Sequence, residues 1–139
     1  MGHLVCFLSI QVQPRQLLER DHWQQCSIAR QVLLNFLVNA GHALKGKDAG
    51  RIEVATGASN GRVFVSVCDN GPGIPDSMQE TIFEPFITTK PAGEGTGLGL
   101  WLSRAIVDED GGEIALRSKP GDTLFSVYLP AARDVPTAE

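Results

Sequence analysis

The chain has few cysteines, no long apolar run and no excess of basic residues. Its three cysteines, Cys6, Cys26 and Cys68, are odd in number, far apart and without any Cys-x-x-Cys pair, which predicts free thiols in a reducing compartment. No apolar run reaches the roughly 18–20 residues that span a bilayer. Val5–Leu8 is too short for the core of a signal peptide and lacks a basic flank. We therefore expect a cytoplasmic domain, which a longer parent protein could still attach to a membrane.

The charge balance is mildly acidic. Twelve Lys and Arg residues against 16 Asp and Glu residues give a net charge of −4, which argues against a broad surface for nucleic acid or for an anionic membrane. This charge is compatible with an anionic nucleotide, because a nest of backbone amides with one or two cations can hold phosphates. The length of 139 residues and the hydrophobic fraction of 42% predict one domain that buries about two-thirds of its unfolded surface.

Hydrophobic patterning predicts an α+β fold. Strands are expected at residues 4–12, 51–55, 62–68, 113–118 and 123–129. The second and third would be joined through Gly57–Gly61, and the last two through the turn Pro120–Asp122. The order of the elements predicts a mixed sheet that helices cover on one face.

Two helices and one short helical turn are expected, at residues 28–44, 98–110 and 78–83. Ser27 is the candidate N-cap of the first helix, and Gly111–Gly112 would end the second. Residues 84–96 show no periodicity and are interpreted as a mobile lid.

Glycine occupies every second position from Gly93 to Gly99, at the start of the helix expected at 98–110. Glycines let backbone N–H groups approach a ligand that a β-carbon would keep away. The free N–H groups and the positive dipole end of the helix face the same place, which suits a polyphosphate. A plain flexible loop is the alternative, since linkers contain similar glycine runs.

Asn35 and Asn39 are one turn apart on the first predicted helix, so their amides point to the same side. Amide oxygens are hard, neutral ligands that suit Mg²⁺. The alternative is a pair of solvent-facing asparagines, although asparagine is a poor residue for the interior of a helix.

Asp69 comes directly after a predicted strand and precedes the stretch Asn70–Pro75, which is rich in glycine and proline. A carboxylate in this place can accept hydrogen bonds from an exocyclic amine such as that of adenine. The alternative is an Asp-Asn-Gly turn, which these residues often form. A two-residue hairpin turn would be followed at once by a strand, and no such strand follows here, so the glycines favour a thin wall beside a ligand.

Four motifs in order resemble those of the GHKL ATP-binding domains, and within them the catalytic domain of two-component sensor histidine kinases. Gln31–Ala40 resembles the N box, Asp69–Pro75 the G1 box, Ile82–Phe86 the F box and Gly95–Leu100 the G2 box. The resemblance covers residues 27–130. It implies an α/β sandwich of the Bergerat type with a flexible ATP lid.

The resemblance also implies roles for individual residues. Asn39 would ligate a Mg²⁺ ion that bridges the ATP phosphates, Asn35 would orient water or the γ-phosphoryl group, and Lys90 would contact the γ-phosphate. Asp69 would accept a bond from the adenine amine. The remaining nucleotide contacts would come from the glycine boxes, the entrance to the lid and the last strand, at Gly71, Gly73, Ile74, Thr88, Thr89, Gly95, Thr96, Gly97, Leu98, Gly99, Leu100 and Thr123.

Such a domain would bind ATP and Mg²⁺ and donate the γ-phosphoryl group to a histidine on a separate dimerising helical hairpin of the same parent kinase. A response regulator would act downstream. His3, His22 and His42 lack the His-Glu or His-Asp sequence typical of that acceptor. Because the family dimerises through the hairpin, the resemblance implies that the domain by itself is a monomer. Phe83 and Phe86 would anchor the lid on apolar surface.

Other functions use the same motifs. The ATPases of the superfamily, such as gyrase and the heat-shock chaperone, carry a glutamate where this chain has Asn35, so hydrolysis is not the expected main function. A serine/threonine kinase of the anti-sigma type and a non-catalytic ATP-binding module are the two alternatives. Transfer of labelled phosphate to histidine, to serine or to neither distinguishes the three.

Overall fold

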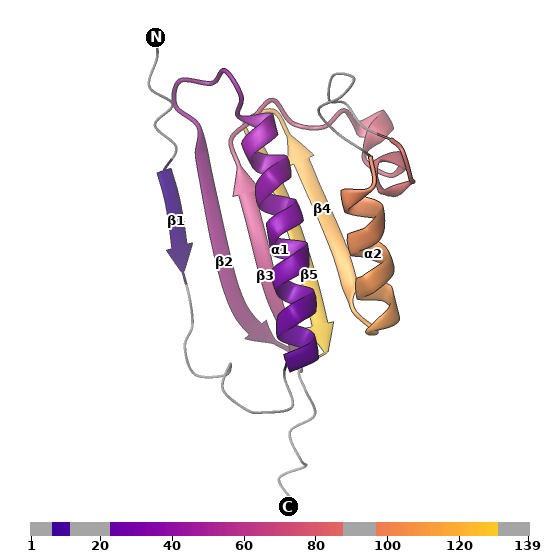
Figure 1. Ribbon diagram of the computed structural model, residues 1–139. Coiled ribbons are helices and arrows are strands. Elements are labelled where there is room, and N and C mark those ends of the chain that lie inside the picture. The colour runs from indigo at the N-terminus through magenta and orange to yellow at the C-terminus, as the bar shows by residue number, and fades with distance from the viewer. Residues whose placement is uncertain (1–6, 12–22, 88–96, 131–139) are drawn as a thin grey trace, which may run out of the picture.

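The centre of the molecule is a five-stranded sheet in the order β1-β2-β3-β5-β4 (Figure 1). The computed structural model describes residues 7–11, 23–87 and 97–130. The strands are β1 (Phe7–Gln11), β2 (Arg51–Ser59), β3 (Arg62–Asp69), β4 (Glu113–Lys119) and β5 (Asp122–Pro130). β1 runs parallel to β2, and the other neighbouring pairs are antiparallel. The predicted mixed sheet is therefore confirmed.

Two α-helices lie on one face of this sheet (Figure 1). They are α1 (Trp23–Ala43) and α2 (Gly99–Glu109), which contact each other. Two short 3₁₀ turns, η2 (Asp76–Met78) and η3 (Thr81–Phe83), stand where one helical turn was predicted. The predicted helical layer is confirmed. In the part of the chain that the structure describes, no helix is long and apolar enough to cross a membrane.

Helix α1 begins earlier than the sequence pattern indicated. It starts at Trp23, so Ser27 lies inside the helix and the prediction that it is the N-cap was wrong. Residues 23–27 contain neither glycine nor proline, and Ser27 is exposed. A serine on an exposed helix surface costs only a few tenths of a kcal/mol, so the helix continues through it.

The hairpin between β2 and β3 is tighter than predicted. β2 extends to Ser59, and the turn consists of Asn60 and Gly61, which have φ values of 53° and 74° as a type I′ turn requires. The prediction that Gly57 belongs to the connection was wrong, because Gly57 pairs with Phe64 in the ladder. A β-carbon at residue 57 would come within 2.7 Å of the Phe64 ring, so the ring fills the place of a side chain.

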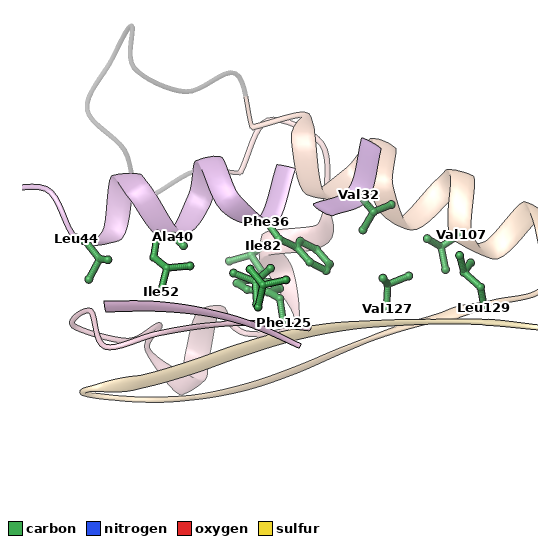
Figure 2. Close-up of a cluster of buried hydrophobic side chains, with 12 residues drawn as sticks. Val32, Phe36, Ala40, Leu44, Ile52, Ile82, Val107, Phe125, Val127 and Leu129 are labelled. Carbon is green, nitrogen blue, oxygen red and sulfur yellow. The ribbon is translucent and has the colours of Figure 1, made fainter. Parts of the chain in front are cut away.

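The core lies between α1 and the sheet (Figure 2). One face of α1 contributes four almost inaccessible side chains with helical spacing, Val32, Phe36, Ala40 and Leu44. Figure 2 shows Phe36 close to Phe125 of β5, and the centroids of the two rings are 5.1 Å apart. Full burial of a side chain of this size stabilises the fold by about 1.5–3 kcal/mol. These four residues form the apolar face of α1, and they fix which side of the helix faces away from the core.

The C-terminus of α2 is closed by two glycines, as predicted. Gly111 has φ +78° and donates from its N–H to Asp108 O at 3.1 Å, while Gly112 N donates to Val107 O at 2.9 Å. These two bonds form a Schellman motif. The predicted turn between β4 and β5 is confirmed as well, with Gly121 at φ +85°.

One end of the sheet gathers several of the candidate segments. β3 ends there at Asp69, which pairs with Thr123 at the start of β5. The C-terminal end of α1 and the start of α2 lie at the same end (Figure 1). The fold thus brings together segments that are more than 50 residues apart along the chain.

Candidate functional site

Two buried polar side chains lie on neighbouring strands at this end of the sheet. Asp69 of β3 pairs with Thr123 of β5, and the two residues are 4% and 3% exposed. Val67, two residues before Asp69, and Phe125, two residues after Thr123, are core residues. Because side chains alternate along a strand, Asp69 and Thr123 share the face that the helices cover. The edge of the core here carries a carboxylate and a hydroxyl.

Among the described residues, the Asp69 carboxylate has one hydrogen-bond donor and no cationic partner. Its Oδ1 accepts a hydrogen bond from Gly71 N at 2.9 Å, and within residues 23–87 and 97–130 no Lys or Arg forms an ion pair with it. Burial raises the pKa of Asp69 above its ordinary value, the Gly71 bond lowers it, and the charge of Asp122 raises it. A buried carboxylate of this kind gains from a hydrogen-bond donor on a ligand.

Cys68 precedes Asp69 and points to the other face of the sheet. Its Sγ lies 3.2 Å from Asp122 Oδ1, and burial, followed by this hydrogen bond, raises the pKa of the thiol to about 11. Cys68 is free, as predicted for a chain without a disulfide framework. The raised pKa keeps the thiol protonated near neutral pH, where it is a poor nucleophile.

The loop that follows Asp69 forms hydrogen bonds with the segments on either side of β3, at the start of β2 and at the turn between β4 and β5. Asn70 donates from Nδ2 to Ala49 O at 2.9 Å and accepts at Oδ1 from Arg51 N at 2.7 Å. On the other side, Gly71 O accepts from Gly121 N at 2.8 Å. The predicted G1 segment is therefore a loop fixed by hydrogen bonds at its start.

Two glycines of this loop are required by contacts within the protein. A β-carbon on Gly71 would lie 2.8 Å from Asp69 Oδ1 and 3.1 Å from Ala43 Cβ. Gly73 has φ +84°, and its β-carbon would lie 2.8 Å from the backbone C and O of Lys119. The role that the resemblance implies for them, close approach of the base, stays a prediction. Ile74, the next predicted contact, packs against the core.

Gln79 and Ser118 hold the far end of the loop, and neither residue was predicted from the sequence to belong to the site. Gln79 donates from Nε2 to Ile74 O (3.0 Å), Asp76 Oδ1 (3.1 Å) and Ser118 O (3.2 Å). The Ser118 hydroxyl accepts from Ile74 N at 2.9 Å and lies 2.7 Å from Thr123 Oγ1. These bonds join residues up to 44 positions apart, so no local sequence pattern predicts them.

Asn35 connects α1 to the first turn of α2. Its Nδ2 donates to Ser103 Oγ at 2.7 Å and to Gly99 O at 3.3 Å, and Ser103 is fully buried. The alternative of a solvent-facing amide is therefore wrong for Asn35. Asn39 lies one turn further along the same face of α1 and is half-buried. The predicted roles of both residues towards phosphate and Mg²⁺ stay predictions.

The first turn of α2 carries no side-chain cap and no acidic residue. Leu98 stands at the N-cap position, after Gly97 with φ +69°. Leu100 packs on the core cluster and so fixes the orientation of the turn. Backbone N–H groups in the first turn of a helix can bind an anion. The phosphate contacts predicted at Gly97, Leu98, Gly99 and Leu100 stay predictions.

The two phenylalanines of the predicted F box behave differently. Phe83 packs edge-on against Phe125, with centroids 6.5 Å apart, and the Arg104 guanidinium lies over the Phe83 ring, 5.4 Å from its centroid. Phe86 is 74% exposed and has φ +68°, so the prediction that it anchors the lid on apolar surface was wrong. Its N–H donates to Gly97 O at 2.9 Å, which fixes the backbone while the ring points outward.

Five predicted nucleotide contacts lie outside the described residues, namely Thr88, Thr89, Lys90, Gly95 and Thr96. Their roles stay predictions.

Comparison with known proteins identifies the family. The family described as "Histidine kinase-, DNA gyrase B-, and HSP90-like ATPase" matches residues 26–133. The chain belongs to this ATPase family. The match covers α2, all of α1 except residues 23–25, four of the five strands and every candidate site residue named above.

Several relatives within this ATPase family are sensor kinases. The sensory histidine kinase/phosphatase NtrB of Vibrio alginolyticus is 35% identical over 130 residues, which cover 86% of this chain and 35% of NtrB. The signal transduction histidine-protein kinase AtoS of Escherichia coli is 43% identical over 105 residues, which cover 74% of this chain and 17% of AtoS. The C4-dicarboxylate transport sensor protein DctB of Rhizobium meliloti is 42% identical over 102 residues, or 73% and 16% of the two chains. The chain thus spans a third or less of the length of most of these relatives.

Solved structures of the ATPase family share the fold. The catalytic domain of histidine kinase ThkA, in a nucleotide-free form, superimposes with a TM-score of 0.71 and 35% identity over 91% of this chain and 77% of ThkA. Full-length ShkA in complex with AMPPNP gives a TM-score of 0.72 and 31% identity over 92% of this chain and 26% of ShkA. The predicted α+β sandwich is confirmed.

Proposed function

We propose that this domain binds ATP with Mg²⁺ and donates the γ-phosphoryl group to a histidine on a separate dimerising hairpin in two-component signalling. The observation that carries the proposal is the buried carboxylate of Asp69, which forms no ion pair with a described Lys or Arg, at the same end of the fold as the start of α2, where the described residues provide no side-chain cap. The first suits an amine and the second suits phosphates. The AMPPNP complex of ShkA supports ATP as the ligand, because AMPPNP is an analogue of ATP.

Asp69 and its loop are proposed to hold the adenine. The carboxylate accepts the exocyclic amine, which supplies a second donor beside Gly71 N. The Gly71 bond already occupies Oδ1, so the orientation of the carboxylate is set before the nucleotide arrives. Thr123, Gly71, Gly73 and Ile74 surround this end of the site.

Asn39 is the proposed protein ligand of Mg²⁺. Its amide oxygen is of the hard type that Mg²⁺ prefers, and this ion commonly takes one or two protein ligands together with phosphate oxygens and water. Asn35, on the same face of α1, already contacts the first turn of α2, so the donor set fits a cation beside phosphates at that turn. When bound, the ion neutralises phosphate charge. Thr88, Thr89, Lys90, Gly95 and Thr96 are further proposed contacts, on the family resemblance.

Transfer is favoured over hydrolysis by the chemistry of α1. A carboxylate that could activate water one turn before Asn39 is absent, because that position is Asn35. Its amide nitrogen is engaged by Ser103 and Gly99, and an amide has no basic function at neutral pH. Phosphoryl transfer needs mainly positioning and charge neutralisation, which glycines, amides and a metal ion supply.

Apolar side chains near the start of α2 support a macromolecular acceptor. Phe86 is 74% exposed, Trp101 41% and Leu102 42%, and Phe86 is held next to Gly97 by a backbone bond. Exposed aromatic and aliphatic groups beside a phosphate-binding turn suit a helical hairpin that must bring its histidine to the γ-phosphate. Because the acceptor hairpin lies elsewhere, we expect the isolated domain to be a monomer, and because it consumes ATP, we place it in the cytoplasm.

Incubation with labelled ATP, Mg²⁺ and a dimerising hairpin that carries an acceptor histidine tests the proposed function. We expect an acid-labile phosphohistidine on the hairpin and no label when that histidine is glutamine. Asn39→Ala should abolish labelling, because the phosphates lose their metal ligand. Label on serine would support the anti-sigma type of kinase, and ATP binding without any label would support the non-catalytic module.

Trp101→Glu is expected to raise the hairpin concentration needed for half-maximal transfer by at least about tenfold, with the Kd for ATP unchanged. A charge in an apolar contact opposes docking, and loss of a central aromatic contact costs about 2 kcal/mol or more. Ala115→Glu is the control, since this exposed residue of β4 lies on the face of the sheet that carries no helix. Equal effects of the two variants would show that Trp101 lies outside the docking surface.

A further inference from the structure

The hydroxyl of Ser118 joins two parts of the site, and the proposed function gives it no role so far. Ser118 is near the end of β4, where its Oγ accepts from Ile74 N at 2.9 Å and lies 2.7 Å from Thr123 Oγ1. Thr123 is 3% exposed and is the cross-strand partner of Asp69. Ser118 therefore touches the proposed base-binding loop and one of the proposed base contacts at the same time.

The number of protons and lone pairs at this contact limits the hydrogen bonds that Thr123 can make to a ligand. An amide N–H only donates, and a hydroxyl has one proton and two lone pairs. Ile74 N takes one lone pair of Ser118 Oγ. The other lone pair and the single proton of Ser118 remain for Thr123, so one of the two hydroxyls must donate to the other.

The charge of Asp69 determines which of the two hydroxyls, Ser118 or Thr123, donates in this hydrogen bond. The carboxylate and the Thr123 hydroxyl lie on adjacent strands, on the same face, and both are buried, so the negative charge acts on the hydroxyl at low dielectric. A negative potential attracts the proton of Thr123 and repels its lone pairs. Ser118 then donates to Thr123, and the proton of Thr123 lies on the side of the Asp69 carboxylate, where the amine of the base is proposed to bind.

We propose that Ser118 is a positioning residue that keeps the Thr123 hydroxyl a hydrogen-bond donor towards the base and so favours adenine over guanine. The inference rests on the proposed binding of ATP. Adenine has a ring-nitrogen acceptor next to its amine, whereas guanine has an N–H and a carbonyl oxygen at the corresponding positions. A carboxylate beside a hydroxyl donor matches adenine at both places and opposes guanine at both.

Gln79 separates this role from simple support of the loop. Its Nε2 holds Ile74 O and Ser118 O, so it braces the same loop and the same strand. It makes no bond to Thr123. Loss of Gln79 should loosen the loop for any nucleotide, while loss of the Ser118 hydroxyl should change the preference between nucleotides.

Calorimetric titration with Mg²⁺-ATP and Mg²⁺-GTP tests the inference on the whole domain. Ser118→Ala also removes the bond from Ile74 N, which should affect both nucleotides, so the expected result is a loss of ATP binding about three- to tenfold greater than the loss of GTP binding, the effect of one neutral hydrogen bond. Ser118→Thr, which keeps a hydroxyl at this position, should keep the preference for ATP. Gln79→Ala should weaken both nucleotides by the same factor. Ser66→Ala, on the opposite face of β3, is the matched control and should change neither.

Thr123→Val keeps the experiment decisive if Ser118→Ala folds poorly. This variant should show the same loss of preference, and adding Ser118→Ala to it should change the ATP-to-GTP ratio no further. An unchanged ratio in both single variants, or equal losses for the two nucleotides in Ser118→Ala, would overturn the inference while ATP binding stands. If the unmodified domain binds no ATP, the proposed function fails first.

Discussion

Asp69→Asn is expected to weaken ATP binding about ten- to a hundredfold while the domain stays folded. The substitution replaces a charged acceptor by a neutral amide, and a hydrogen bond to a charged group contributes about 1.5–3 kcal/mol, which corresponds to this range of Kd. The Asn side chain can still accept from Gly71 N, so the bond that Asp69 makes at 2.9 Å within the protein is retained.

The same substitution should leave the stability of the ligand-free domain equal or higher near neutral pH. Burial raises the pKa of Asp69 in the folded state above its ordinary value, so the folded state binds a proton more tightly than the unfolded state. Ionisation of Asp69 therefore opposes folding at neutral pH, and this cost disappears as the pH falls through the raised pKa. Asn removes the titration and with it this contribution to the pH dependence.

Two measurements on one pair of proteins check this prediction. Titration calorimetry gives the Kd for ATP, and urea unfolding between neutral pH and about pH 4 gives the free energy of unfolding. Glu109→Gln, which neutralises an exposed carboxylate at the end of α2, is the control and should change neither quantity appreciably. Unchanged ATP affinity in Asp69→Asn would refute the assignment of Asp69 to the adenine.

The order of the elements could be predicted because each has a local signal. The alternation in β3, the apolar face of α1 and the Gly111–Gly112 end of α2 depend on residues within one element or next to it. The errors lie at ends without such a signal. The start of α1 depends on the absence of breakers before Ser27, and the length of β2 depends on the Phe64 ring above Gly57.

The site was predictable to the extent that its chemistry lies in short motifs. Asp69 and the glycines around it could be proposed from their neighbours in the chain. Ser118 and Gln79 could not, because their partners are brought to them by the sheet and by η2. The outward ring of Phe86 could not be foreseen either, since a φ of +68° is uncommon for phenylalanine and has no local sequence signal.

Gly73→Ala is expected to destabilise the domain by about 2–5 kcal/mol. A positive φ costs a residue with a β-carbon roughly 1–2 kcal/mol, and crowding in a packed site adds about 1–3 kcal/mol. Both apply here, because Gly73 has φ +84° and its β-carbon would meet the backbone of Lys119 at 2.8 Å and Pro120 N at 3.0 Å. Relief of the clash would move the loop away from β4, in the direction that stretches the bond from Ile74 to Ser118.

Gly121→Ala isolates the contact from the conformational cost. Gly121 has φ +85°, and a β-carbon there would meet no atom within 4 Å, so only about 1–2 kcal/mol is expected. Urea unfolding should give a lower free energy of unfolding for Gly73→Ala than for Gly121→Ala. Only Gly73→Ala should also weaken ATP binding. Equal losses of stability would mean that the loop yields without cost, in which case the close packing of Gly73 on the turn between β4 and β5 does not hold the base-binding loop in place.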